Sequence, residues 1–110
     1  MRTILAIALS SSLVAAAAAQ SAPQLNAQEK RGEALLQRLC ASCHAIGVSG
    51  TSLHAEAPPF RTLGRRYKVE ALEEALAEGL ISGHPDMPEF QFEPHQVGEV
   101  IAYLNAIQER

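Results

Sequence analysis

Two cysteines and a histidine stand together in this chain of 110 residues, in the order Cys40-Ala41-Ser42-Cys43-His44, and the chain has no other cysteine. A chain of this length can bury one modest core. It has no tryptophan, two tyrosines and three phenylalanines, so large side chains to fill that core are scarce. Small domains of this kind usually need a disulfide, a metal or a cofactor to be stable. The cysteine motif is the place where such a group would attach.

The spacing of the two cysteines is compatible with several kinds of site. A structural zinc site needs four ligands, but there is no second cysteine pair, and His44 directly beside Cys43 is poorly spaced to complete a tetrahedron. A redox-active dithiol of the thioredoxin kind lies between a strand and a helix, and no strand pattern precedes Cys40. A disulfide needs only the pair itself.

The histidine that follows the second cysteine favours a covalently bound haem. Two thiols three positions apart on a tight turn can each add to one of the two vinyl groups at a haem edge, and the next imidazole then points at the iron. We therefore predict one haem c, attached through thioethers to Cys40 and Cys43, with His44 as a ligand of its iron. The haem would also supply the apolar filling that the core lacks.

The N-terminus has the pattern of a secretory signal peptide. Arg2 precedes the run 4–19, which is apolar except for three serines and ends in alanines. This run is shorter than the roughly 20 residues that span a bilayer, and no charged stop follows it, so a membrane anchor is disfavoured. We expect residues 1–19 to be cleaved and residues 20–110 to form one domain in the bacterial periplasm, without stable membrane insertion. Export suits haem c, which is attached outside the cytoplasm.

The charge of the exported part argues against a nucleic-acid or anionic-membrane partner. Loss of Arg2 changes the formal net charge from −3 to −4, and both kinds of partner attract basic proteins. Four glutamates lie close together, at Glu70, Glu73, Glu74 and Glu78. They indicate a solvated helix face or a docking patch for a basic partner.

Helical periodicity recurs in three stretches, and irregular stretches separate them. Asn26 and Glu29 have the spacing of a capping box, which predicts a helix from Asn26 into Cys40. Apolar periodicity and Gly and Pro punctuation place the other elements. They are a loop at 45–60, a short helical piece at 62–66, a helix at 69–80 that Gly79 helps to end, an irregular stretch at 81–93, and a last helix from Pro94. We expect an all-α domain without strands.

Met87 is the expected second ligand of the iron. Met1 leaves with the signal peptide, and Met87 is the one other methionine of the chain. It lies in the irregular segment HPDMPEF at 84–90, whose polar residues and prolines disfavour ordinary core packing. The rival ligands are the remaining histidines, His54, His84 and His95. An open coordination position is the other alternative.

These features together resemble a small bacterial class I cytochrome c. The likeness rests on CASCH after an amphipathic helix, a proline pair at 58–59, the Met87-Pro88 segment, and a closing helix that contains VIAYL at 100–104. It extends over residues 20–110, which we expect to be a cytochrome c domain. It implies the cytochrome c-like fold, in which three to five helices surround one covalently bound haem.

The resemblance also implies a close crossing of the first and last helices. In this family, a glycine and an apolar residue on the first helix pack against an apolar residue and an aromatic residue on the last. Gly32 and Leu36 match the first pair, and Val100 and Tyr103 match the second. A glycine in the middle of a helix costs about 1 kcal/mol relative to alanine, and a close crossing would explain Gly32.

A loop proline of this family accepts a hydrogen bond at its carbonyl from the ring of the proximal histidine, which orients that ligand. Pro58 is our candidate and Pro59 the alternative, because the chain reads Ala57-Pro58-Pro59 where the family has Gly-Pro. The haem propionates would find basic or hydroxyl groups just after the prolines. These are Arg61, Arg65, Arg66 and Tyr67, although a solvated basic turn explains them equally well.

The expected function is the transfer of single electrons. A haem iron held by His44 and Met87 has no position left for a substrate, and His/Met ligation raises its reduction potential. The chain has no catalytic constellation, so we expect an electron carrier and not an enzyme. Its partners would be redox proteins such as a dehydrogenase, an oxidase or another cytochrome, and it would be a monomer or a small enzyme subunit. The alternatives are a haem-binding subunit of an oxidoreductase complex and a five-coordinate haem protein that binds or senses small ligands.

Overall fold

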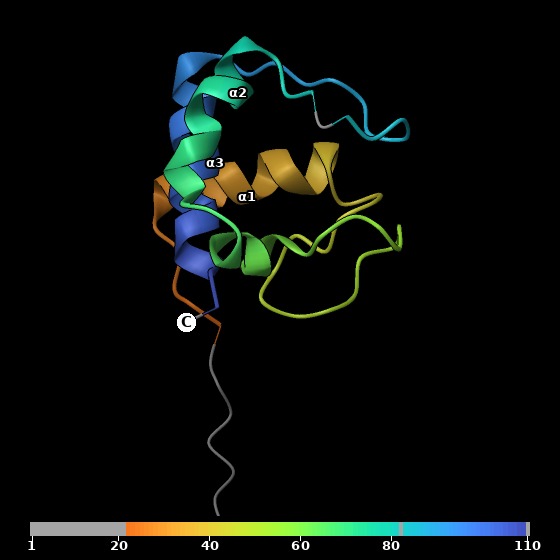
Figure 1. Cartoon of the computed structure of the whole chain (residues 1–110). Helices are drawn as coiled ribbons and strands as arrows, with labels where there is room; N and C mark the ends of the chain where they lie inside the picture. The colour runs from red at the N-terminus through yellow and green to blue at the C-terminus, as the bar shows by residue number, and fades with distance from the viewer. Residues whose placement is uncertain (1–21, 82, 110) are drawn as a thin grey trace, which may run out of the picture.

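The computed structural model describes residues 22–81 and 83–109 (Figure 1). Its two longest helices lie near the beginning and the end of this part of the chain. Its α-helices are α1 (Ala27–Leu39), α2 (Glu73–Glu78) and α3 (Pro94–Ile107), and the 3-10 helices η1 (Phe60–Arg65) and η2 (Val69–Leu72) lie between α1 and α2. In the described ranges there is no strand, only an isolated bridge between Leu80 and Phe90. The predicted all-α fold is confirmed. The predicted signal peptide at 1–19 lies outside the described residues.

The first helix begins at its predicted capping box. The Asn26 side chain accepts a hydrogen bond from the Glu29 backbone N–H at 2.9 Å, and the Glu29 carboxylate accepts one from the Asn26 N–H at 2.8 Å. These bonds satisfy N–H groups that have no partner inside the helix. At the other end, the Cys40 N–H donates to the Leu36 carbonyl at 2.8 Å. The helix therefore leads directly into the cysteine motif, as predicted.

The helices α1 and α3 cross closely at Gly32. A Cβ atom on Gly32 would lie 2.0 Å from the backbone oxygen of Glu99 and 2.9 Å from the Cβ of Tyr103. Only a glycine allows the two backbones to approach this far. Val100 and Tyr103 on the facing side of α3 are each 1% exposed, and Leu36 on α1 is 3% exposed. The crossing inferred from the resemblance is confirmed.

The hydrophobic core lies where α1, α2 and the 3-10 helices pack on α3. Six of its buried side chains come from α3 itself. The buried apolar residues are Leu35, Leu36, Leu63, Val69, Leu76, Phe92, Val97, Val100, Ile101, Tyr103, Leu104 and Ile107. α3 is therefore the element against which the others are placed.

The helix predicted at 69–80 is divided in the structure. Val69–Leu72 is a 3-10 helix, and α-helical geometry begins only at Glu73. Such a tighter turn is common at the N-terminus of an α-helix. Gly79 ends α2 with a φ of 119°, a conformation that a residue with a Cβ rarely adopts. The piece predicted at 62–66 is likewise a 3-10 helix, and it begins at Phe60.

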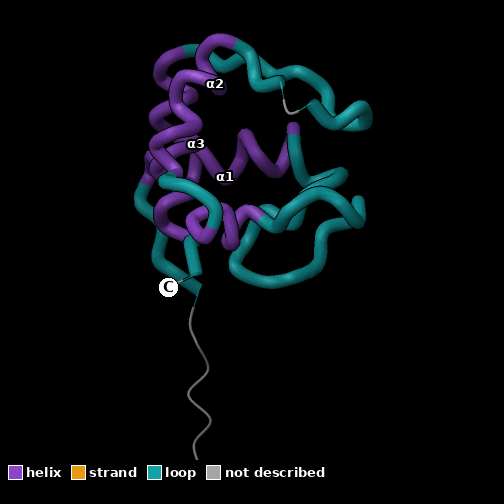
Figure 2. The backbone as a smooth tube through the Cα atoms, viewed as in Figure 1, coloured by secondary structure: helices purple, strands orange, loops and turns teal. Residues whose placement is uncertain are grey.

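Two long irregular segments extend from the same side of the helices (Figures 1 and 2). Residues 40–59, which begin with the cysteine motif, connect α1 to η1, and residues 79–93 connect α2 to α3. The Leu80 N–H donates to the Phe90 carbonyl at 2.8 Å, and the Phe92 N–H donates to the Leu76 carbonyl at 2.8 Å. The first bond closes the base of the second segment, and the second bond holds this base to α2. Residues of both segments line one cavity together with the helices.

Candidate functional site

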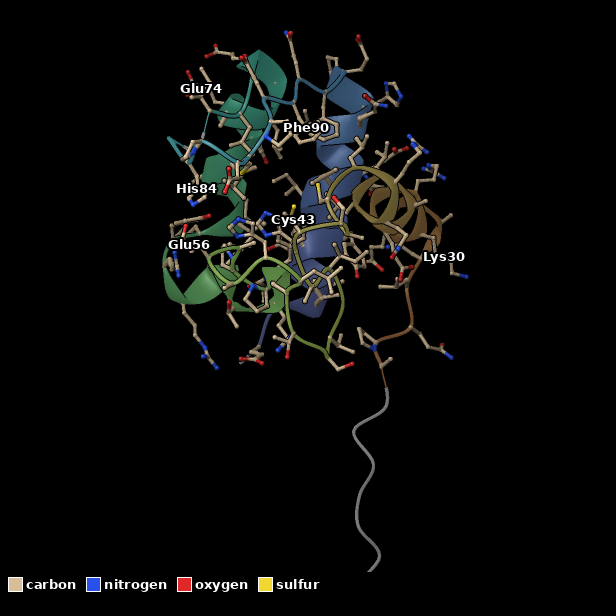
Figure 3. The ribbon with its side chains drawn as sticks, turned by 90° about the vertical axis from the view of Figure 1, so that its right-hand side faces the viewer. Lys30, Cys43, Glu56, Glu74, His84 and Phe90 are labelled. Atoms are coloured by element: carbon tan, nitrogen blue, oxygen red, sulfur yellow. The ribbon has the colours of Figure 1, made fainter. Side chains whose placement is uncertain are left out.

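A cavity of about 520 Å³ lies between the helices and the two irregular segments. Most of its wall is apolar, with side chains such as Leu36 on α1, Leu76 on α2 and Leu104 on α3. Its volume is in the range of roughly 300–1,000 Å³ that is usual for ligand and cofactor pockets. The five residues predicted from the sequence to bind the haem or orient its ligand all line it; they are Cys40, Cys43, His44, Pro58 and Met87. Figure 3 looks toward this region, with Cys43 near its centre.

The cysteine motif forms one turn that continues from α1. The N–H groups of Cys43 and His44 both donate to the Cys40 carbonyl, at 3.1 and 2.9 Å. Residues three positions apart in such a turn lie on one face, so both thiols lie along one wall of the cavity. The two sulfurs are free and form no disulfide. Burial, with a smaller effect of Cys43, raises the pKa of the Cys40 thiol to about 11, so this thiol keeps its proton at neutral pH.

The ring of His44 is held by a proline carbonyl. His44 Nδ1 lies 2.8 Å from the Pro58 carbonyl oxygen, and because a carbonyl only accepts, Nδ1 carries the proton. This leaves Nε2 with a lone pair that can bind a metal. The Pro59 carbonyl instead accepts from the N–H and hydroxyl of Thr62, at 3.1 and 2.8 Å. Pro58 is thus the residue that orients the imidazole, because Pro59 starts η1.

Phe60 is a contact of His44 that the sequence did not predict. Its ring centroid lies 4.6 Å from that of the imidazole, with the planes tilted by 32°. The Phe60 N–H donates to the Ala45 carbonyl at 3.0 Å, and the Phe60 carbonyl accepts from Gln108 Nε2 at 2.8 Å. The sequence feature that could have indicated this contact is an aromatic residue directly after the proline pair. The Phe60 ring restricts rotation of the imidazole in addition to the hydrogen bond to Pro58.

Tyr103 ties the segment behind His44 to α3. Its hydroxyl donates to the Ile46 carbonyl at 2.8 Å. Burial, with a smaller effect of Glu33, raises the pKa of Tyr103 to about 12. The Ala45 N–H donates to Ser52 Oγ at 3.0 Å. The residues after the cysteine motif are therefore held although they have no regular structure.

Met87 enters the cavity lining from the second irregular segment. Of the rival histidines, His54 and His84 also line the cavity, but their Nε2 atoms face carboxylates of the opposite segment. His54 Nε2 lies 3.2 Å from Asp86 Oδ2, and His84 Nε2 contacts the Glu56 carboxylate. His95 is exposed on the first turn of α3 and is not part of the lining.

The comparison of the chain with known protein families indicates the same class of protein as the arrangement of the two cysteines and His44. The family model described as "Cytochrome C oxidase, cbb3-type, subunit III" matches residues 27–104. The chain belongs to this family of c-type cytochromes. Cytochrome c-552 of Bradyrhizobium diazoefficiens is 33% identical to this cytochrome over 96 residues, which are 87% of this chain and 90% of that protein. No solved structure matches the cytochrome with significance.

The cavity fits the haem c that this family binds covalently. Two thiols on one turn face an apolar space, and His44 Nε2 makes no hydrogen bond to any described residue. The apolar wall suits a porphyrin, and a thioether sulfur is also present in the lining. The cytochrome is therefore an electron-transfer haem protein with haem c as its cofactor. Among its described helices, none is long and apolar enough to span a lipid bilayer.

The basic residues after the prolines divide into two groups. Arg61 Nε lies 3.2 Å from the Glu109 carboxylate and its guanidinium donates to the Gly50 carbonyl at 2.8 Å, while Arg65 pairs with the same carboxylate. Arg66 and Tyr67 instead line the cavity. Of the four residues considered for the propionates, these two therefore lie at the cavity.

The acidic cluster of the cytochrome lies outside the haem cavity. Glu70, Glu73 and Glu74 line a shallow open groove beside Pro94 and Val97. Glu70 accepts a hydrogen bond from Asn105 Nδ2 at 2.7 Å. Hydrogen bonds from the backbone and from Asn105 lower the pKa of the Glu70 carboxyl.

Proposed function

We propose that the cytochrome is an exported electron carrier, with haem c attached to Cys40 and Cys43 and its iron held between His44 and Met87. The observation that carries this proposal is the single cavity that all four residues line. Met87 lies more than forty positions after the cysteine motif, so the fold has to bring the two segments together. An apolar wall between them is what a haem requires.

The residues of the cavity would hold one coordination geometry and exclude water. When bound, the haem iron supplies a reversible one-electron couple between Fe(III) and Fe(II). The Pro58 carbonyl accepts a hydrogen bond from the Nδ1–H of His44, which makes Nε2 a better electron-pair donor to a metal. Phe60 and the segment tied down by Tyr103 limit movement of that ring. A site that barely moves between two charge states suits electron transfer between protein partners.

Substitution of Met87 by alanine tests the ligand set. In the oxidised holo-protein, Met87→Ala should abolish the weak sulfur-to-iron charge-transfer absorption and lower the reduction potential, because a thioether ligand raises it. The reduced variant should also bind carbon monoxide readily, whereas the wild type should not. Absorption spectra and a redox titration measure these changes.

His95→Ala is the matched control, because this histidine is exposed and lies outside the cavity. It should leave the spectra and the potential unchanged. An unchanged spectrum in Met87→Ala would rule Met87 out as a ligand. Rapid binding of carbon monoxide by the reduced wild type would favour a five-coordinate ligand-binding protein instead.

Export of the cytochrome is supported by the apolar N-terminal run at 4–19. We expect the mature protein to begin at Gln20 and to occur in the periplasm, which N-terminal sequencing of the fractionated protein measures. A protein that keeps residues 1–19 and sediments with membranes would contradict cleavage.

A role as an enzyme subunit is the second candidate function. It is supported by the description of the matching family, which names subunit III of a cbb3-type oxidase. The cytochrome also covers 90% of the length of a relative named simply as a cytochrome, which supports a free carrier. Purification from the native periplasm and membranes distinguishes the two: a free carrier elutes alone, and a subunit elutes with an oxidoreductase complex.

A further inference from the structure

Two short segments of the same form face each other at the edge of the cavity. The first contains His54 and Glu56, and the second contains His84 and Asp86, so each has a histidine followed two positions later by an acid. The pairing between them is reciprocal. His54 Nε2 lies 3.2 Å from Asp86 Oδ2, and His84 Nε2 contacts the Glu56 carboxylate. We call these four residues the loop clasp.

The internal bonds of the loop clasp are also the same on both sides. The Glu56 N–H lies 3.3 Å from His54 Nδ1, and the Asp86 N–H lies 3.3 Å from His84 Nδ1. Because each Nδ1 accepts a hydrogen bond from a backbone N–H, each ring carries its hydrogen on Nε2, and this N–H donates a hydrogen bond to the carboxylate of the other segment. The two rings meet edge to face, with centroids 5.4 Å apart and an interplanar angle of 88°. Both segments are thus shaped to meet each other.

The loop clasp connects the two sides of the proposed haem site. On one side, the backbone N–H of His54 donates to the Cys43 carbonyl at 3.1 Å, and Cys43 directly precedes His44. On the other side, Asp86 directly precedes Met87, whose N–H lies 3.2 Å from the His84 carbonyl. All four clasp residues line the same cavity as Met87. Figure 3 shows His84 and Glu56 together at one side of Cys43.

The segment that bears Met87 has little regular structure to support it. Residues 81–89 form no helix or strand where they are described, and the bridge between Leu80 and Phe90 closes only their base. The histidines of the loop clasp are about one-third exposed and its carboxylates about two-thirds exposed, at 31% for His54 and 67% for Asp86. Exposed pairs contribute little to global stability. Their effect should therefore be local, on the position of this segment.

We propose that the loop clasp is a set of positioning residues for Met87, which keep its sulfur over the cavity at a fixed distance from the turn that bears His44. This inference rests on the proposed function, because it takes Met87 to be an iron ligand. His54 and Glu56 on the first segment reach the Met87 segment through their contacts with Asp86 and His84. Their removal should let the Met87 segment open more often while the fold remains intact.

The test is the rate at which excess imidazole replaces Met87 in the oxidised holo-protein, measured by stopped-flow absorption. At saturating imidazole this rate is limited by release of the sulfur. The double variant His54→Ala/Glu56→Ala should raise the limiting rate about tenfold, which corresponds to about 1.4 kcal/mol. Each single variant should give a smaller increase, which keeps the test available if the double variant folds poorly.

Two controls separate positioning from a general loss of structure. Glu89→Ala removes a carboxylate from the same segment that makes no ion pair with any described residue, and it should leave the rate unchanged. Glu56→Gln keeps an acceptor oxygen for His84 and should restore most of the wild-type rate. A limiting rate within twofold of wild type in the double variant would overturn the role of the clasp. If Met87→Ala leaves the spectrum unchanged, Met87 is not an iron ligand, and the proposed function is refuted at that point. This outcome is distinct from an unchanged imidazole rate in the double variant, which refutes only the role of the loop clasp.

Discussion

Replacement of Gly32 by alanine should destabilise the cytochrome by about 2 kcal/mol, although alanine is the better helix former. The new Cβ would lie 2.0 Å from the Glu99 carbonyl oxygen and 2.6 Å from its carbonyl carbon, whereas ordinary contact begins at 3.4 Å. These are backbone atoms, so no side chain can rotate out of the way. The helices α1 and α3 must separate instead.

The size of the effect follows from this separation. A gap of roughly 0.5–1 Å already forfeits a quarter to a half of the dispersion energy of the atoms that face each other, and the crossing contains Val100 and Tyr103, each 1% exposed. Overpacking typically costs about 1–3 kcal/mol, and a clash between backbones belongs at the upper end. The higher helix propensity of alanine offsets about 1 kcal/mol. The net loss corresponds to roughly 10 °C in the midpoint of thermal unfolding.

Gly98→Ala is the matched control for this prediction. It also lies inside a helix, but the nearest neighbour of a new Cβ would be Gln28 Nε2 at 3.5 Å, an ordinary contact. It should therefore stabilise the protein by about 0.5–1 kcal/mol. The assay is guanidinium unfolding of the oxidised holo-protein followed by far-UV circular dichroism. A Gly32→Ala variant as stable as the wild type, beside a stabilised Gly98→Ala, would refute the reasoning.

Two other substitutions test the cap of α1 and the tether behind His44. Asn26→Ala removes one bond of the capping box and should lower the free energy of unfolding by about 1 kcal/mol, with the haem spectrum unchanged; an unaltered midpoint of guanidinium unfolding would contradict this. Tyr103→Phe leaves the Ile46 carbonyl without its donor and should cost about 1 kcal/mol at neutral pH. Folded Tyr103 keeps its proton up to a pKa of about 12, against an ordinary value of 10.0, so the free energy of unfolding should fall as pH rises from 10 to 12, by at most about 3 kcal/mol. Denaturation across this range should show the fall in the wild type, and an equal fall in Tyr103→Phe would mean that another group causes it.

Short patterns of a few consecutive residues were enough to predict the cofactor and the ends of the helices from the sequence alone. The cysteines and His44 predict haem attachment because that chemistry needs those groups at that spacing. Asn26 with Glu29, Gly79, and Pro94 mark helix ends because their backbone preferences and hydrogen bonds act within one turn. The close crossing at Gly32 was implied by the resemblance to class I cytochromes c, and it explains a glycine that otherwise only costs stability inside a helix. For the cysteine motif and the helix ends, the physical cause lies within the segment that carries the signal, whereas the cause of Gly32 is its contact with Glu99 and Tyr103 on α3.

The tertiary structure alone decided which partners these residues meet across the cavity. Pro58, and not Pro59, faces His44 because Pro59 is used to start η1. The stacking of Phe60 on the imidazole and the pairing of His54 with Asp86 join residues in segments without periodicity, where no pattern relates a residue to its neighbour in space. Such contacts depend on how α1 and α3 cross and on how far each loop then reaches. The cofactor and the helix ends are thus local properties of the sequence, whereas the contacts that hold the His44 ring and join the two loops are a property of the whole fold.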